Sequence, residues 1–206
     1  WLDHDQRIVW IDHHISAIRK IDKNIPGLRM DGVAACRLAW LYFNSLATPT
    51  MIDGAIKDHV LQDLEIFEEP QAIKMVGEYD VWDLSPKVLD FQYGLVARKM
   101  LAWDKKTLAR WVNLMEDPMM ARDVEESGRW GRAYYDEQAK VTCKLKAYEL
   151  EFEGLKFLAM NSCDPSSRAF NTPKIDQYDG LLKWHFTPEG RISISLYRPQ
   201  ADDKLD

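Results

Sequence analysis

The chain has 206 residues, a formal net charge of −6 at pH 7 and 46% hydrophobic residues, a composition typical of globular proteins. This length accommodates one large domain or two small ones. The negative charge weighs against strong non-specific attraction to nucleic acid and leaves room only for a local basic groove. No apolar run reaches the ~20 residues that span a bilayer, so no membrane is expected among the partners.

The three cysteines, Cys36, Cys143 and Cys163, lie far apart and show no metal-binding spacing. An odd number of cysteines without a disulfide framework is typical of a reducing compartment. No secretory signal opens the sequence. These features predict a cytoplasmic protein with unpaired thiols.

The apolar run at residues 8–11 leads directly into Asp12, His13 and His14. An apolar run without polar alternation predicts a strand that is covered on both faces, as in a parallel α/β sheet. Open α/β sheets bind ligands at the carboxyl ends of their strands. We therefore expect these three polar side chains to face a crevice.

Their chemistry suits a metal ion and a phosphate. A neutral imidazole binds transition metals, and a neighbouring carboxylate can fix its tautomer. Because adjacent side chains of an extended segment point opposite ways, His13 and His14 are expected to differ in role, one binding metal and the other phosphate. The alternative is a cluster at a strand end that only binds backbone groups.

Further along, Asp31 and Gly32 precede an apolar helix predicted over residues 33–46, with Asp31 at its N-cap. A helix amino end favours phosphate, which makes Gly32 a candidate binding residue. Apolar spacing predicts a second helix over residues 51–67. A short helix over residues 71–76 then leads to Gly77 and the residues that follow it.

Asp80 lies between apolar residues shortly after this short helix, an arrangement that fixes the direction of its side chain. A two-metal site needs carboxylates from different chain segments, because one segment cannot surround two ions. Asp80 is therefore a candidate metal ligand. The alternative is an aspartate that caps a helix or stabilises a turn.

The remaining pattern predicts helices and then strands, with a change of character near residue 148. We expect a first domain over residues 1–120, a connecting helix over 121–147 and a second domain over 148–206. The predicted elements are helices at 86–103, 105–115 and 122–147, strands at 149–153 and 155–160, and a hairpin of strands 181–186 and 192–197.

Three segments resemble motifs of the DHH phosphoesterase superfamily: Ile11-Asp-His-His14, Gly32–Trp40 and Gly77–Trp82. The similarity is greatest to the branch described as exopolyphosphatase-like or DHH-family phosphohydrolases. The resemblance implies an α/β fold, in which a partial, helix-rich DHH domain with a parallel sheet precedes the start of a smaller α+β C-terminal domain.

The resemblance also implies roles for residues. It makes Asp12, His13, His14 and Asp80 catalytic, with His13 and Asp80 as metal ligands. It implies Mn²⁺ or Mg²⁺ as cofactor, with two ions in the complete protein. The substrate-binding residues that it implies are His14, Gly32, Ser166, Ser167, Arg168 and Asn171.

The implied function is hydrolysis of phosphoester or phosphoanhydride bonds in a small nucleotide, a short oligonucleotide or polyphosphate. The family's Asp-x-Asp motifs are expected before residue 1 and its Gly-rich His motif after Tyr197, so this chain is expected to be part of a longer protein. The alternatives are a truncated or degenerate relative that binds a phosphate ligand, a metal or a protein partner without turnover, and a purely structural module. The sequence leaves the oligomeric state open.

Overall fold

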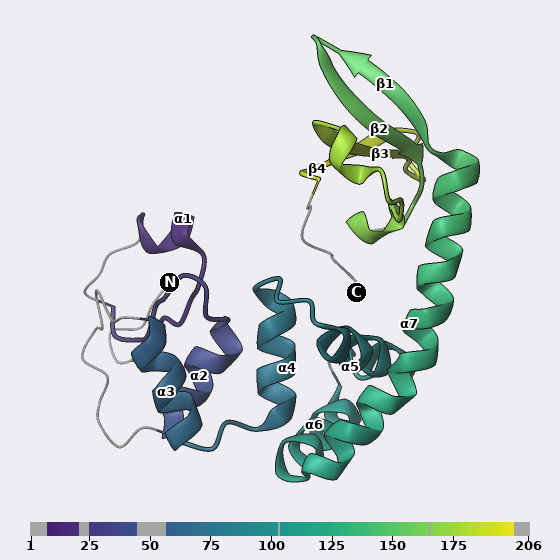
Figure 1. The fold of residues 1–206 in the computed structure, drawn as a ribbon. Helices are drawn as coiled ribbons and strands as arrows, with labels where there is room; N and C mark the ends of the chain where they lie inside the picture. The colour runs from purple at the N-terminus through teal and green to yellow at the C-terminus, as the bar shows by residue number, and fades with distance from the viewer. Residues whose placement is uncertain (1–7, 21–24, 45–56, 103, 165, 200–206) are drawn as a thin grey trace. The chain divides into compact units, whose positions relative to one another are not determined.

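The computed structural model describes residues 8–20, 25–44, 57–102, 104–164 and 166–199 (Figure 1). Two compact units make up the chain, residues 1–131 and residues 132–206, and each is described by itself. The described residues form seven α-helices and one four-stranded sheet. The fold is therefore mixed α/β, which confirms the expected class.

The first unit is helical among its described residues. None of the described helices of the chain has both the length and the apolar character that crossing a bilayer requires. The helices of this unit are α1 (Ile15–Ile18), α2 (Ala35–Asn44), α3 (Lys57–Ile66), α4 (Gln71–Asp80), α5 (Pro86–Ala97), α6 (Lys105–Glu116) and the first part of α7 (Pro118–Lys146).

The parallel sheet that the sequence predicted for this part of the chain is not formed by its described residues. The run at residues 8–11 is extended, but it pairs with one segment only, through a parallel bridge between Asp12 and Arg29. Ile8 and Val9 are exposed, against the expectation of a strand covered on both faces. The expected direction of pairing, parallel, is present in this single bridge.

Helix boundaries follow the sequence pattern with local corrections. Helix α5 ends before residue 103 because Lys99 adopts a left-handed conformation, φ 53°, which terminates a helix. Helix α7 begins earlier than expected, at Pro118, since proline is well suited to a first helical turn. Helix α4 extends to Asp80, so this residue ends a helix and does not follow one. Residues 45–46 and 51–56 of the expected helices lie outside the described residues.

Two apolar cores stabilise the first unit, and α4 connects them. One core joins residues 28–33 to α2 and α3, through Leu38 and Leu64 among others. The other joins α4 to α5, α6 and α7, through Met75 and Phe91 among others. Since α4 packs against α2 as well as against α5 and α6, it connects both cores.

Glycines let α5 and α7 cross at close range. A Cβ atom on Gly128 of α7 would overlap the carbonyl oxygen of Asp90 in α5, and one on Gly94 of α5 would overlap that of Val124 in α7. Gly131 differs, since the nearest atoms to its Cβ would be side-chain atoms of Tyr93 at 3.9 Å. The crossing therefore requires glycine at positions 94 and 128 and tolerates alanine at position 131.

The second unit holds the sheet. Its order is β1-β2-β3-β4, with antiparallel pairs at both ends and a parallel pair of β2 and β3 in the middle. The predicted hairpin of residues 181–186 and 192–197 is confirmed, and the strands predicted at 149–153 and 155–160 are present as an antiparallel pair. The sheet packs one face against the end of α7 and a 3₁₀ helix, η1 (Ser167–Ala169). The strands are β1 (Tyr148–Phe152), β2 (Leu155–Asn161), β3 (Gly180–Phe186) and β4 (Ile192–Tyr197), and a second 3₁₀ helix, η2, spans Ile175–Gln177.

The two glycines of α7 give a matched test of this packing. We expect Gly128→Ala to lower the free energy of unfolding by about 2–3 kcal/mol, because the added methyl group must separate α5 from α7. Gly131→Ala should raise it by up to about 1 kcal/mol, the gain in helix propensity. Urea unfolding followed by circular dichroism measures both. Equal stability of the two variants would contradict the close crossing.

Candidate metal centre

The candidate site begins where the extended segment ends. Residues 10–12 are held beside residues 26–30 by backbone hydrogen bonds, and the chain then turns into α1 at His14. The three bonds are Trp10 N–H to Pro26 C=O at 2.8 Å, Asp12 N–H to Leu28 C=O at 3.2 Å and Met30 N–H to Asp12 C=O at 3.1 Å.

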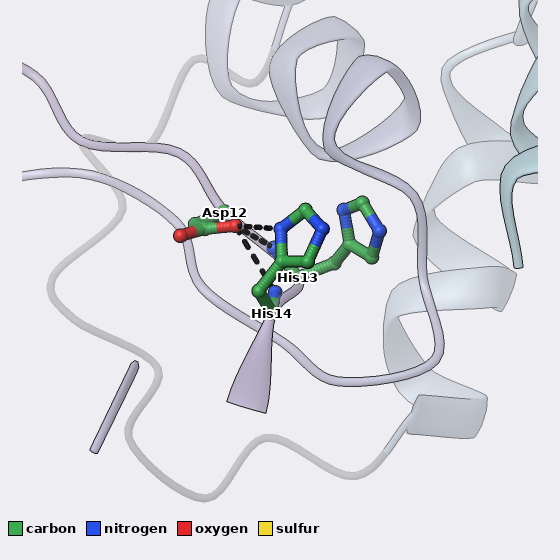
Figure 2. Close-up of side chains that lie close together, drawn as sticks. All are labelled: Asp12, His13 and His14. Atoms are coloured by element: carbon green, nitrogen blue, oxygen red, sulfur yellow. Dashed lines mark hydrogen bonds and ion pairs between the residues drawn. The ribbon is translucent and has the colours of Figure 1, made fainter. Parts of the chain in front are cut away.

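Asp12, His13 and His14 form a compact cluster (Figure 2). One ligand atom from each lies within 4.8 Å of the others, and the two imidazole centroids are 4.2 Å apart. The expectation that the histidine side chains point opposite ways was wrong. The backbone of His14 is still extended, with φ −80° and ψ 107°, but the contact of its ring with the Asp12 carboxylate at 2.8 Å keeps the two rings together.

The Asp12 carboxylate organises this cluster. Its Oδ1 accepts hydrogen bonds from the His13 amide at 2.8 Å and the His14 amide at 3.0 Å, and lies 2.8 Å from His14 Nδ1. Burial acts to raise the pKa of Asp12, but the hydrogen bonds from His14 and His13 outweigh it and lower the pKa. Asp12 is thus held as a carboxylate, in the form that binds metal ions.

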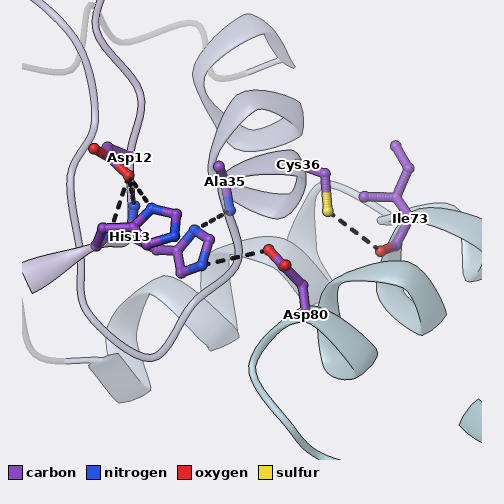
Figure 3. A network of polar contacts seen from close by, with 7 residues as sticks. Asp12, His13, Ala35, Cys36, Ile73 and Asp80 are labelled. Carbon is purple, nitrogen blue, oxygen red and sulfur yellow. Dashed lines mark hydrogen bonds and ion pairs between the residues drawn. The ribbon is translucent and has the colours of Figure 1, made fainter. Parts of the chain in front are cut away.

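His13 connects the cluster to two helices (Figure 3). Its Nδ1 accepts from the backbone N–H of Ala35, the first residue of α2, at 3.2 Å. Its Nε2 lies 3.4 Å from Oδ2 of Asp80 at the end of α4. Asp31, the expected N-cap of α2, lies exposed four residues before the helix. His13, and not Asp31, accepts the hydrogen bond from the backbone N–H at the start of α2.

Asp80 is half exposed, and its carboxylate points toward His13. It is the last residue of α4, and Trp82, two residues further on, takes a left-handed conformation with φ 63°. The structure therefore brings together all four residues that the sequence singled out as catalytic: Asp12, His13, His14 and Asp80.

A buried ion pair fixes α2 relative to the segment that leads into α4. The Arg37 guanidinium of α2 donates two hydrogen bonds to Glu69, at 2.8 Å and 2.7 Å. Burial acts to lower the pKa of Arg37, but the bonds to Glu69 and its charge outweigh it and raise the pKa. A Cβ on Gly77 of α4 would overlap the Arg37 side chain, so the glycine gives that side chain its path. Sequence reasoning missed this pair, although an arginine inside an apolar helix signals that a buried charge needs a partner.

Cys36 lies beside the site without belonging to it (Figure 3). Its thiol contacts the carbonyl oxygen of Ile73 at 3.8 Å. Burial raises the pKa of Cys36 to about 11, and the negative charge of Asp80 adds to the shift. Since the thiolate is the form that binds metal, Cys36 stays a neutral thiol at pH 7.

An acidic cavity of about 600 Å³ is lined by α3, α4 and the loops beside them. Gly32, the expected phosphate contact, lines it together with five carboxylates and two cationic side chains. Burial raises the pKa of Glu78 in this cavity, and the charges of Asp83 and Glu69 raise it against those of Lys74 and Arg37. Such a lining disfavours phosphate beside Gly32 unless cations neutralise it.

Apart from His14 of the cluster, the other expected substrate contacts belong to the second unit. Three of them are engaged within that unit. Arg168 donates to the Asp136 carboxylate at 2.6 Å, Asn171 donates to the Asp136 carbonyl at 3.2 Å, and the Ser166 hydroxyl accepts from the Arg168 amide at 3.2 Å. Ser167 starts η1. These bonds fasten the loop to α7.

Lys183 of β3 binds the same loop, which contains Asp164 and Ser166. Its ammonium group is buried, donates to the carbonyl oxygens of Asp164 and Ser166, and lies 4.9 Å from the ring centre of Tyr197. Sequence reasoning missed this role, because a lysine within a strand usually extends into water.

Comparisons of the chain with protein-family models, curated proteins and solved structures found no match. The resemblance to DHH phosphoesterases therefore stays a prediction from the three sequence motifs.

The reactivity of the cysteines tests the packing of α2 against α4. We expect iodoacetamide at pH 8 to label Cys163, which is exposed, at least about 10-fold faster than Cys36. The raised pKa of Cys36 leaves almost none of it as the reactive thiolate. Peptide mass spectrometry over time measures both rates, with buried Cys143 as a second protected site. Labelling of Cys36 as fast as Cys163 would contradict the packing of α2 against α4.

Proposed function

We propose that the protein is a metal-dependent phosphohydrolase of the DHH type, acting on phosphoester or phosphoanhydride bonds. The observation that carries the proposal is the convergence of Asp12, His13 and His14 from one segment with Asp80 from a separate helix. Two carboxylates and two imidazoles from distant parts of the chain form a donor set that metal-dependent hydrolases use.

The donor types fit Mn²⁺ better than Mg²⁺. Magnesium prefers oxygen ligands throughout, whereas imidazole suits the transition metals. Asp12, His13, His14 and Asp80 supply enough donors for one ion. A second ion requires further carboxylates to neutralise and bridge the pair.

When bound, the metal would activate water and stabilise charge on phosphoryl oxygens. The chain's own residues would position the groups around it. Asp12 fixes the orientation of the His14 ring, and the Ala35 amide orients the His13 ring before metal binds. The negative net charge and the acidic cavity favour a small phosphorylated substrate or a short oligonucleotide over a long nucleic acid.

Metal binding and turnover test this function together. We expect the chain to bind Mn²⁺, and His13→Ala and Asp80→Asn to weaken that binding by at least about 10-fold, because each removes a donor. Isothermal titration calorimetry measures affinity. Hydrolysis of short oligonucleotides, cyclic dinucleotides and polyphosphate with Mn²⁺ measures turnover, which both substitutions should abolish.

Asp83→Asn is the matched control, since Asp83 is an exposed acid three residues from Asp80 and is not among the residues that cluster with His13. Its Mn²⁺ affinity should equal that of the parent. Unchanged affinity in His13→Ala and Asp80→Asn would refute the site. Mn²⁺ binding without turnover of any substrate would favour the non-catalytic relative.

The tautomer of His13 gives a test that does not need turnover. A neutral ring that accepts from the Ala35 amide carries its proton on Nε2, facing Asp80. Metal binding through Nε2 requires this proton to move to Nδ1, which ends the bond from Ala35. We expect Zn²⁺, a diamagnetic probe, to convert the His13 Nδ1 signal in nitrogen-15 NMR from acceptor type to protonated type.

His185 in β3 serves as the internal reference, because it belongs to the second unit. Its ring nitrogen signals should not change with Zn²⁺. A His13 Nδ1 that remains an acceptor while Zn²⁺ is bound would rule out Nε2 as a metal ligand.

A further inference from the structure

The sheet of the second unit has one face that packs on its own core and one that does not. Residues paired across strands share a face, so Tyr148 in β1 lies on the same face as Ala159, Leu182 and Leu196 of the next three strands. We call this side the apolar face. The residues of the opposite side, such as Leu158 in β2, pack in the core of this unit.

The apolar face is large. Six of its residues have exposed fractions between 48% and 66%. Since a large side chain covers about 150–250 Å², they together present roughly 500–900 Å² of apolar surface. Monomeric proteins rarely expose a continuous apolar patch beyond a few hundred Å². The six residues are Phe152, Leu155, Phe186, Ile192, Ile194 and Leu196.

This face holds no charged side chain among the described strand residues. Strand alternation sends Lys156, Lys183 and His185 to the opposite side. The indole N–H of Trp184 donates to the Tyr148 hydroxyl at 2.9 Å, so this donor is satisfied within the sheet. Burial of the apolar face would therefore leave neither a charge nor the indole donor without a partner.

We propose that the apolar face binds the same face of a second copy of this chain. The exposed area matches the ~800 Å² per partner that a standard stable interface buries. Two sheets pack face to face through apolar side chains, and a two-fold axis brings identical patches together without any need for complementary charges. An uncharged, apolar surface suits a second apolar surface better than a charged partner, and homodimer interfaces are the more apolar class.

Sedimentation velocity of the 206-residue chain, from low to high micromolar concentration, tests this dimer. We expect the parent chain to dimerise and Leu196→Glu to raise the dissociation constant by at least about 30-fold, the effect of losing an interface hot spot. Leu108→Glu is the matched control, since Leu108 of α6 is 65% exposed against 66% for Leu196 and belongs to the first unit. It should leave the dissociation constant unchanged.

Near-UV circular dichroism verifies that each variant is folded. Ile194→Thr, which keeps a β-branched residue in β4, is the milder second variant should Leu196→Glu unfold, and it should also weaken the dimer. A parent chain that stays monomeric at every concentration would overturn the proposal, whether water or residues of the first unit cover the face. A dimer that both substitutions leave intact would overturn it too. Neither outcome bears on the metal site.

Discussion

The buried ion pair of Arg37 and Glu69 is the constraint on which the helical unit depends. Both side chains are withdrawn from water, and two hydrogen bonds at 2.8 Å and 2.7 Å join the guanidinium to the carboxylate. An unpaired charge at this depth would cost about 3–5 kcal/mol, whereas the intact pair is close to neutral against apolar packing. The pair therefore acts less as a source of stability than as a penalty on any arrangement that separates its partners.

The geometry of the candidate site follows from this constraint. Arg37 fixes α2 against α4 because its side chain passes over Gly77, where only a hydrogen leaves it room. Helix α2 then presents the Ala35 amide to His13, while α4 presents Asp80 to the other ring nitrogen. The imidazole of His13 therefore contacts both helices. Any change that shifts α2 along α4 would alter both contacts of this ring at once.

The sequence predicted what depends on local pattern and missed what depends on neighbours. Apolar spacing located the helices, and the alternation of residues 181–186 and 192–197 located the β3–β4 hairpin. The motif around His13 and the anchored position of Asp80 identified residues that the structure brings together. The cap of α2 could not be predicted, because it comes from His13, which lies 22 residues before Ala35. Local rules favoured the nearer Asp31.

The same limit applies to two apolar surfaces of the chain. An apolar β-segment indicates that a face will be covered, but the pattern does not identify the covering element. The run at residues 8–11 predicted cover on both sides, yet one described segment pairs with it and Ile8 remains exposed. The sheet of the second unit repeats the situation on a larger scale, with Leu196 and its neighbours apolar and uncovered within the unit. Since the hydrophobic effect penalises such a surface in proportion to its area, the larger face is the one that drives association.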